Sequence, residues 1–149
     1  MKRQTLTVLL LTLCSCFVNG QDTITSYFDR NWKKCNGSSP FAVYYRKAYS
    51  YDSGMWIVED YHMNGYLQMK GQFSDKKLKK KHGTFIYYHQ NGKVSSSGQC
   101  SNNERIGTWK MYFKNGSIAA EGKMSSNKRD SIWTLYHMNG TVLSNLHYS

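Results

Sequence analysis

The chain has 149 residues, which favours a single domain, and a net charge of +11. Apolar residues make up 40% of the sequence and aromatic residues 15%, a bias that suits half-exposed sheet surfaces better than a deep aliphatic core. With one proline and few stretches of helical periodicity, the composition predicts an all-β chain and leaves little room for helices outside the N-terminus.

Residues 1–20 have the layout of a secretory signal peptide, with a basic start and an apolar stretch too short for the roughly 20 residues that span a bilayer. Cleavage after Gly20 would leave Gln21 as the first residue. The alternative is a bacterial lipoprotein signal, in which Cys16 would be acylated and would anchor the mature chain. Both interpretations predict export to the periplasm or cell envelope, or secretion beyond it.

Loss of Lys2 and Arg3 with the leader leaves 18 basic against 9 acidic residues, a net charge of +9. This charge favours a protein partner or an anionic envelope component, lipid or glycan. Export argues against nucleic acid. Cys35 and Cys100 are the two cysteines of the mature chain. In an oxidising compartment they could form a disulfide that pins the lead-in segment to the second repeat, or remain free thiols.

Residues 21–40 are expected to form a polar lead-in segment, and residues 41–149 the strand domain. The first expected strand is 41–49, which continues through a turn at 52–54 into a second strand at 55–62.

A pattern of Tyr, two variable residues, Asn and Gly then occurs four times. The turn pairs are Asn64 and Gly65, Asn91 and Gly92, Asn115 and Gly116, and Asn139 and Gly140. Asn and Gly both tolerate positive φ, as the centre of a type I′ turn requires, so the pattern predicts four hairpins. The glycines are 27, 24 and 24 residues apart, a spacing typical of repeat architectures. We therefore expect about five antiparallel hairpins in an elongated, twisted sheet.

Three further columns repeat in register with the turns. A glycine six residues after the turn glycine is expected to mark a bend or bulge where neighbouring backbones come close. A second small-residue column opens the next strand, and a large aromatic follows it, expected on one face with tyrosines on the other. The columns are Gly71, Gly98 and Gly122; Gly83, Gly107 and Ser131; and Phe85, Trp109 and Trp133.

The longer first step places an insertion between two hairpins, and this insertion is rich in lysine. Its candidate anion-binding residues are Lys76, Lys77, Lys79, Lys80 and Lys81. The alternative is a solvated loop that keeps the protein soluble.

Taken together, aromatic-x-x-Tyr-x-x-Asn-Gly-x-aliphatic with its glycine columns resembles the MORN repeat variant of bacterial proteins over about residues 54–149. Ser131 and Phe85 depart from the expected Gly and Trp of their columns. The resemblance implies a ribbon of stacked hairpins used as a binding or spacing scaffold. Some relatives are labelled antitoxins, and the related eukaryotic repeat is associated with membrane apposition and anionic lipid.

No catalytic residues, metal site or cofactor is predicted. His62, His89 and His137 share a column with Phe113, which favours a tolerant strand position over a metal ladder. The adjacent Glu59 and Asp60 face opposite sides of a strand, and no nucleophile and base are paired.

The sequence therefore predicts a non-enzymatic exported repeat protein that acts as a binding or scaffold module at the bacterial cell envelope. The alternatives are a lipid-anchored envelope protein that binds anionic lipid or glycan, and an antitoxin-like protein that masks a toxin.

Overall fold

The computed structural model describes residues 23–52 and 54–149, which form strands and turns without a helix. The expected signal peptide, its cleavage site and Cys16 lie outside these residues. The strands are β1 (Thr23–Phe28), β2 (Lys34–Cys35), β3 (Tyr44–Asp52), β4 (Met55–His62), β5 (Leu67–Phe73), β6 (Lys81–Tyr88), β7 (Val94–Ser101), β8 (Glu104–Tyr112), β9 (Ile118–Ser125), β10 (Lys128–Tyr136) and β11 (Val142–Tyr148).

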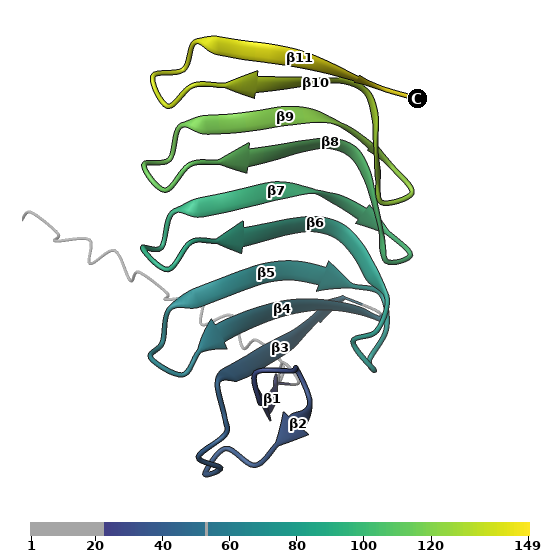
Figure 1. Ribbon diagram of the computed structural model, residues 1–149. Helices are drawn as coiled ribbons and strands as arrows, with labels where there is room; N and C mark the ends of the chain where they lie inside the picture. The colour runs from purple at the N-terminus through teal and green to yellow at the C-terminus, as the bar shows by residue number, and fades with distance from the viewer. Residues whose placement is uncertain (1–22, 53) are drawn as a thin grey trace, which may run out of the picture.

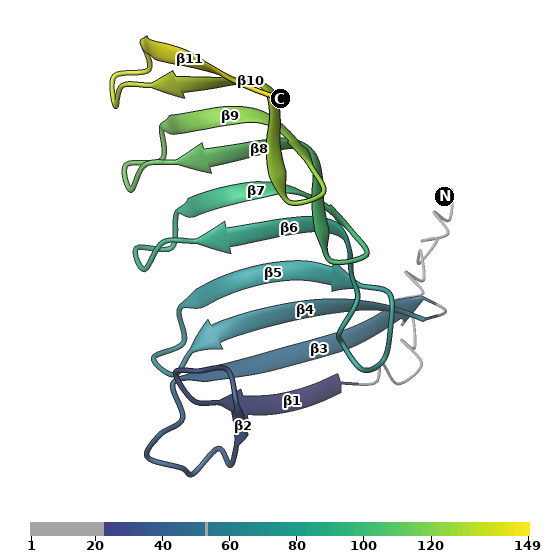
Figure 2. The same ribbon diagram turned by 45° about the vertical axis from the view of Figure 1, so that its right-hand side comes forward.

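All eleven strands belong to one open antiparallel sheet with the order β11-β10-β9-β8-β7-β6-β5-β4-β3-β1-β2. From β3 to β11 each strand pairs with the next strand of the chain, so the hairpins stack as a ladder (Figure 1). The turned view shows a single twisted layer with no second layer of described residues on either face (Figure 2). The all-β fold of tandem hairpins predicted from the sequence is confirmed.

The segment 21–40, expected to precede the first strand, contributes two strands to the sheet. β1 pairs with β3 from Thr23 opposite Tyr49 to Phe28 opposite Tyr44. Its sequence alternates Thr, Ile, Thr, Ser, Tyr and Phe, and such β-branched and aromatic residues suit a half-buried strand. The polar composition of the whole segment concealed this short strand, which covers the edge of β3.

The four Asn-Gly pairs form hairpin turns as predicted, but their turn type was predicted wrongly. Positive φ is confined to the glycine of each pair, with 89°, 79°, 93° and 85° at Gly65, Gly92, Gly116 and Gly140. In the first turn, the Gly65 N–H donates to the His62 carbonyl and the His62 N–H to the Tyr66 carbonyl, both at 2.8 Å. This is a three-residue loop closed by a glycine bulge. Asn64 is selected for its side chain, because its Oδ1 accepts the Tyr66 N–H at 3.2 Å.

Turns with the features of type I′ lie at the opposite ends of the strands, where the sequence carries no Asn-Gly. Two-residue loops join β7 to β8 and β9 to β10. Both central residues have positive φ, 47° and 72° at Asn102 and Asn103, and 45° and 68° at Ser126 and Asn127. Figure 1 shows these loops on the side of the sheet away from the Asn-Gly turns. The sequence analysis missed them because it relied on glycine as the turn signal.

One face of the sheet, here called the core face, buries the aromatic column. Phe85, Trp109 and Trp133 are at most 1% exposed. The glycines expected to admit a neighbouring backbone instead admit these rings: a Cβ on Gly122 would lie 2.5 Å from Trp133 Cγ. Gly71 and Gly98 lie under Phe85 and Trp109 in the same way.

The second small-residue column is required for its backbone conformation. φ is 93°, 64° and 59° at Gly83, Gly107 and Ser131, and the register of each strand shifts around these residues. Each is part of a bulge, where a positive φ favours glycine.

Candidate functional site

A row of cations lies over the buried rings of the core face. The guanidinium carbon of Arg105 is 4.5 Å from the Trp109 ring centroid, and that of Arg129 is 4.5 Å from the Trp133 centroid. Lys81 Nζ lies 5.2 Å from the Phe85 centroid. These three residues, the cation row, are spaced 24 residues apart, and each precedes its ring by four residues. The bulge lies between cation and ring, and bulges re-aim side chains in this way.

The turns of the following hairpins fix the backbone of two members of the row. Asn103 Oδ1 accepts the Lys81 N–H at 2.8 Å, while the Asn103 N–H donates to the Lys81 carbonyl at 3.2 Å. Asn127 makes the same pair of hydrogen bonds with Arg105, at 2.8 and 3.2 Å. The left-handed turn asparagines therefore hold each cation in place one repeat before them.

None of the carboxylates in residues 23–52 and 54–149 pairs with the cation row. The ion pairs of this part of the chain are Arg46 with Asp60, Lys70 with Glu59, Lys110 with Glu121, and Lys123 with Asp130. Lys81 Nζ instead donates to the Tyr87 hydroxyl at 3.3 Å, and Arg129 Nη1 to the Tyr148 hydroxyl at 2.7 Å. The core face thus presents half-buried positive charges that no protein anion neutralises.

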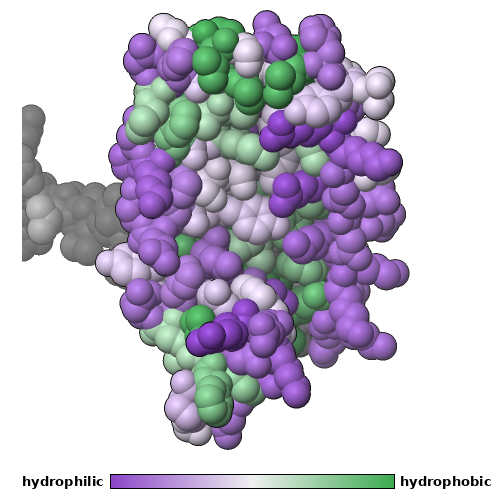
Figure 3. Space-filling view, in the orientation of Figure 1, coloured by the Kyte–Doolittle hydropathy of each residue, from purple (hydrophilic) through white to green (hydrophobic). Residues whose placement is uncertain are grey.

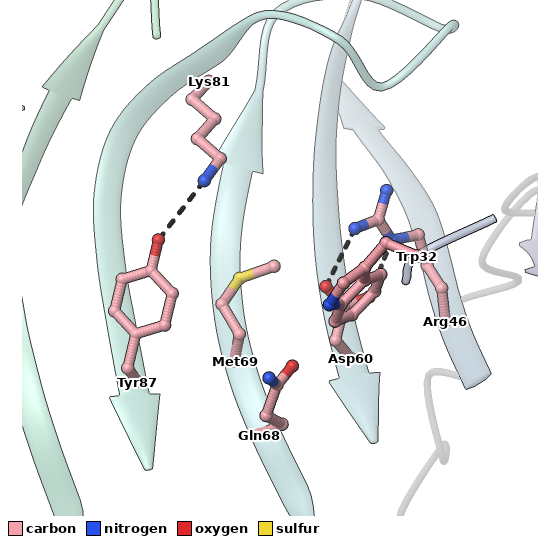
Figure 4. A pocket seen from close by; sticks show the side chains of 7 residues that line it. All are labelled: Trp32, Arg46, Asp60, Gln68, Met69, Lys81 and Tyr87. Carbon is pink, nitrogen blue, oxygen red and sulfur yellow. Dashed lines mark hydrogen bonds and ion pairs between the residues drawn. The ribbon is translucent and has the colours of Figure 1, made fainter. Parts of the chain in front are cut away.

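At the β3–β6 end of the row, the core face is hollowed by a cleft of about 310 Å³. Its lining residues are Trp32, Arg46, Asp60, Gln68, Met69, Lys81 and Tyr87 (Figure 4). Arg46 donates to both carboxylate oxygens of Asp60, at 2.6 and 2.8 Å, and Asp60 is only 2% exposed. This pair is internally neutral, so Lys81 supplies the unpaired charge of the cleft.

Trp32 adopts an unusual backbone conformation at the mouth of the cleft. Its φ is 60°, a value that bulky side chains rarely adopt. The ring stacks on Tyr44 with centroids 4.7 Å apart and lies 5.7 Å from the Arg46 guanidinium carbon. These contacts offset the backbone strain and hold an indole, 38% exposed, beside the charges of the cleft.

The five lysines predicted as one anion-binding cluster are divided by the structure. Lys76, Lys77, Lys79 and Lys80 are exposed in the loop between β5 and β6, whereas Lys81 begins β6 and belongs to the cation row. The loop is ordered by Asp75, whose Oδ1 accepts the N–H groups of Lys79 and Lys80 at 2.9 and 2.6 Å. Sequence reasoning missed Arg105 and Arg129, although their 24-residue spacing from Lys81 was available as a signal.

Cys35 and Cys100 are both free thiols, so the disulfide alternative is wrong. They lie on β2 and β7, six strand positions apart in the sheet order, or about 29 Å at about 4.8 Å per strand. Burial raises the pKa of the Cys100 thiol, and the charges of Lys81 and Arg105 partly oppose this rise.

The predicted histidine column takes part in contacts between repeats. His89 Nε2 lies 2.9 Å from the Tyr112 carbonyl oxygen. Asn91 and Lys93 extend this contact, because their side chains donate to the carbonyls of Lys114 and Asn115 at 2.8 and 2.7 Å. Within the described ranges, no three His, Cys, Asp or Glu side chains are grouped as metal ligands.

The carboxylates on the opposite face are engaged in structural contacts. Glu59 accepts from the Tyr61 hydroxyl at 2.7 Å and from Lys70 at 3.0 Å. Burial raises the pKa of Glu59, but these hydrogen bonds and nearby lysine charges outweigh it and hold the pKa below its usual value. Hydrogen bonds from Tyr136 and Lys110 lower the pKa of Glu121. No helix in the described part of the chain is long and apolar enough to cross a membrane.

This architecture defines a repeat protein of tandem β-hairpins whose ordered charges lie on a sheet face. Residues 81–99 and 105–124 match the family model of the MORN repeat variant, so the chain carries repeats of that family, as the resemblance implied. A comparison with curated proteins found no match. Repeats of this family generally serve as non-catalytic modules of the membrane-associated or binding type.

Proposed function

We propose that this chain is a non-enzymatic exported protein of the bacterial cell envelope and that its core face binds an acidic glycan. The observation that carries the proposal is the cation row of Lys81, Arg105 and Arg129. Three cations repeat with the sheet, are held in place over rings, and have no carboxylate partner among the described residues.

The geometry favours a chain-like anion over a flat membrane. Members of the row are two strands apart, about 10 Å at about 4.8 Å per strand, so a linear polymer crossing the strands meets one cation per repeat. The half-buried cations lie close to the sheet, where a thin chain can approach them. A bilayer surface would first meet the exposed lysines of the β5–β6 loop, which are the natural site for anionic lipid.

The test compares two charge-removing variants of the mature protein. The row variant carries Lys81→Gln, Arg105→Gln and Arg129→Gln, and the loop variant carries Lys76→Gln, Lys77→Gln, Lys79→Gln and Lys80→Gln. The probe is polygalacturonate, a linear uronic-acid polysaccharide, with neutral dextran as the control ligand. We expect the row variant to lose about tenfold or more in affinity and the loop variant to lose far less, because non-specific attraction is screened by salt at physiological strength.

A loop variant that loses as much affinity as the row variant would overturn the proposed site. Binding of dextran as strong as binding of polygalacturonate would overturn the charge argument. Circular dichroism of both variants checks that the sheet is retained.

The envelope location includes two anchoring alternatives, which the N-terminus of the mature protein distinguishes. A soluble exported protein would begin at Gln21, whereas a lipoprotein would begin at an acylated Cys16. Mass spectrometry of the protein from membrane and periplasmic fractions separates the two cases, and an intact Met1 in both fractions would contradict export.

A further inference from the structure

The two edges of the sheet are built differently. At the N-terminal edge, β2 has only two residues, Lys34 and Cys35, and follows Arg30 and Lys33. Short edge strands and lysines are standard means of preventing edge-to-edge pairing. This edge of the sheet is therefore protected.

The C-terminal edge lacks that protection. β11 is seven residues long and has no neighbour on its outer side in the sheet order of the described residues. Val142, Leu143 and Leu146 are 57%, 55% and 37% exposed. Residues 131–149 contain no Asp, Glu, Lys, Arg or Pro. Green apolar residues accordingly gather at the top of the molecule in Figure 3, where Figure 1 places β10 and β11.

The strand is also regular enough to serve as a template. Its pairing with β10 runs without a register shift from Ser131 opposite Tyr148 to Leu135 opposite Ser144. The only shift of this pair lies beside the turn, between Leu135 and Tyr136. The outer N–H and C=O groups of such a strand form a continuous row that another strand can pair with.

We propose that β11 pairs antiparallel with β11 of a second copy of this chain. Two strongly basic copies repel each other over most of their surface, and this charge-free end is where they can approach at least cost. Pairing of all seven residues places Asn145 on the two-fold axis. Val142 then lies opposite Tyr148 of the second copy, and Leu143 opposite its His147.

This register keeps the two core faces on one side. Val142 and Tyr148 both lie on the face of β11 that pairs with the Trp133 side of β10, as does Leu146, which is opposite Trp133. Because side chains alternate between faces, pairing residues of the same parity continues each face across the interface. The contact is isologous and closes at two copies, since the opposite edge is protected. The dimer thus joins two cation rows on one continuous face.

The first test is the oligomeric state of the mature protein by sedimentation velocity. We expect a dimer, and a monomer for Asn145→Lys, which places two like charges opposite each other on the axis. The matched control is Thr25→Lys, an exposed position on β1 near the other edge, which should remain dimeric. A monomeric wild-type protein, a dimeric Asn145→Lys variant, or dissociation by Thr25→Lys would each overturn the proposal.

A second variant tests the register without depending on charge. Asn145→Cys in a Cys35→Ser background should form a covalent dimer under mild oxidation, because the two Cβ atoms lie opposite each other across the axis. Thr25→Cys in the same background should not. If Asn145→Cys fails to cross-link while the protein is dimeric, the dimer uses another surface and the proposal is wrong.

Discussion

The Trp133 ring lies directly against the backbone of Gly122 on the neighbouring strand, so close that a Cβ on this glycine would be 2.5 Å from Trp133 Cγ. Trp133 is fully buried and cannot retreat without disturbing the core face. We therefore expect Gly122→Ala to lower the free energy of unfolding by about 3 kcal/mol, the upper part of the range for overpacking. Urea unfolding monitored by tryptophan fluorescence measures this loss.

Gly107→Ala is the matched control for this substitution. Nothing lies within 4 Å of a Cβ at Gly107, but its φ is +64°. The expected cost is about 1 kcal/mol, from backbone conformation alone. If the two alanine variants lost equal stability, ring packing on Gly122 would not be the reason for the glycine column.

The buried Arg46–Asp60 pair predicts a large effect of removing one charge. Asp60→Asn leaves the guanidinium of Arg46, only 17% exposed, without its anion. We expect a loss of about 3 kcal/mol or more in the free energy of unfolding, as for other broken buried pairs. Lys110→Gln removes a partner from the exposed pair with Glu121 and should cost less than about 1 kcal/mol. A small loss for Asp60→Asn would mean that water replaces the carboxylate.

The lowered pKa of Glu59 predicts a pH dependence of stability. A carboxyl group whose pKa is lower in the folded state stabilises the fold above its unfolded pKa of about 4.3, and this contribution is lost as the pH falls through the folded pKa. Glu59→Gln should therefore be less stable than the wild-type protein at pH 7, and the difference should shrink as the pH falls below 4.3. Urea unfolding at a series of pH values measures it. A difference that stays constant with pH would contradict the proposed hydrogen bonds to the ionised form.

The two thiols predict distinct alkylation kinetics. Cys35 is half-buried at the sheet edge, whereas Cys100 is 4% exposed with a raised pKa. Because the thiolate is the reactive form, iodoacetamide should modify Cys35 first and Cys100 only after unfolding. Mass spectrometry of the native protein follows both sites. Recovery of a disulfide between them after purification without reductant would contradict the strand order.

The fold could be predicted from the sequence because its signals are local and repeated. Asn64 and Gly65 and their three equivalents mark strand reversals, and the register of Phe85, Trp109 and Trp133 gives the face on which they are buried. The turn type could not be obtained in this way, because Asn-Gly serves both type I′ turns and three-residue loops. Only hydrogen bonds such as that from the Tyr66 N–H to Asn64 distinguish the two.

The candidate site could be predicted only in part, because it depends on how bulges direct side chains. Lys81 was identified, but it was assigned to the loop with Lys80, since adjacent lysines look alike in the sequence. Placing Arg105 over Trp109 requires the bulge at Gly107, which shifts the simple alternation of a strand. The roles of Asn103 and Asn127 involve contacts between repeats more than 20 residues apart, and their turns carry no glycine.

An NMR titration of the isotope-labelled mature protein with polygalacturonate tests the role of the core face most directly. We expect the side-chain Nε–Hε signals of Arg105 and Arg129 and the indole signals of Trp109 and Trp133 to shift together and to saturate, while amides on the opposite face around Tyr112 remain in place. Shifts confined to the loop of Lys76 to Lys80, or to the face that carries Tyr112, would contradict binding at the cation row.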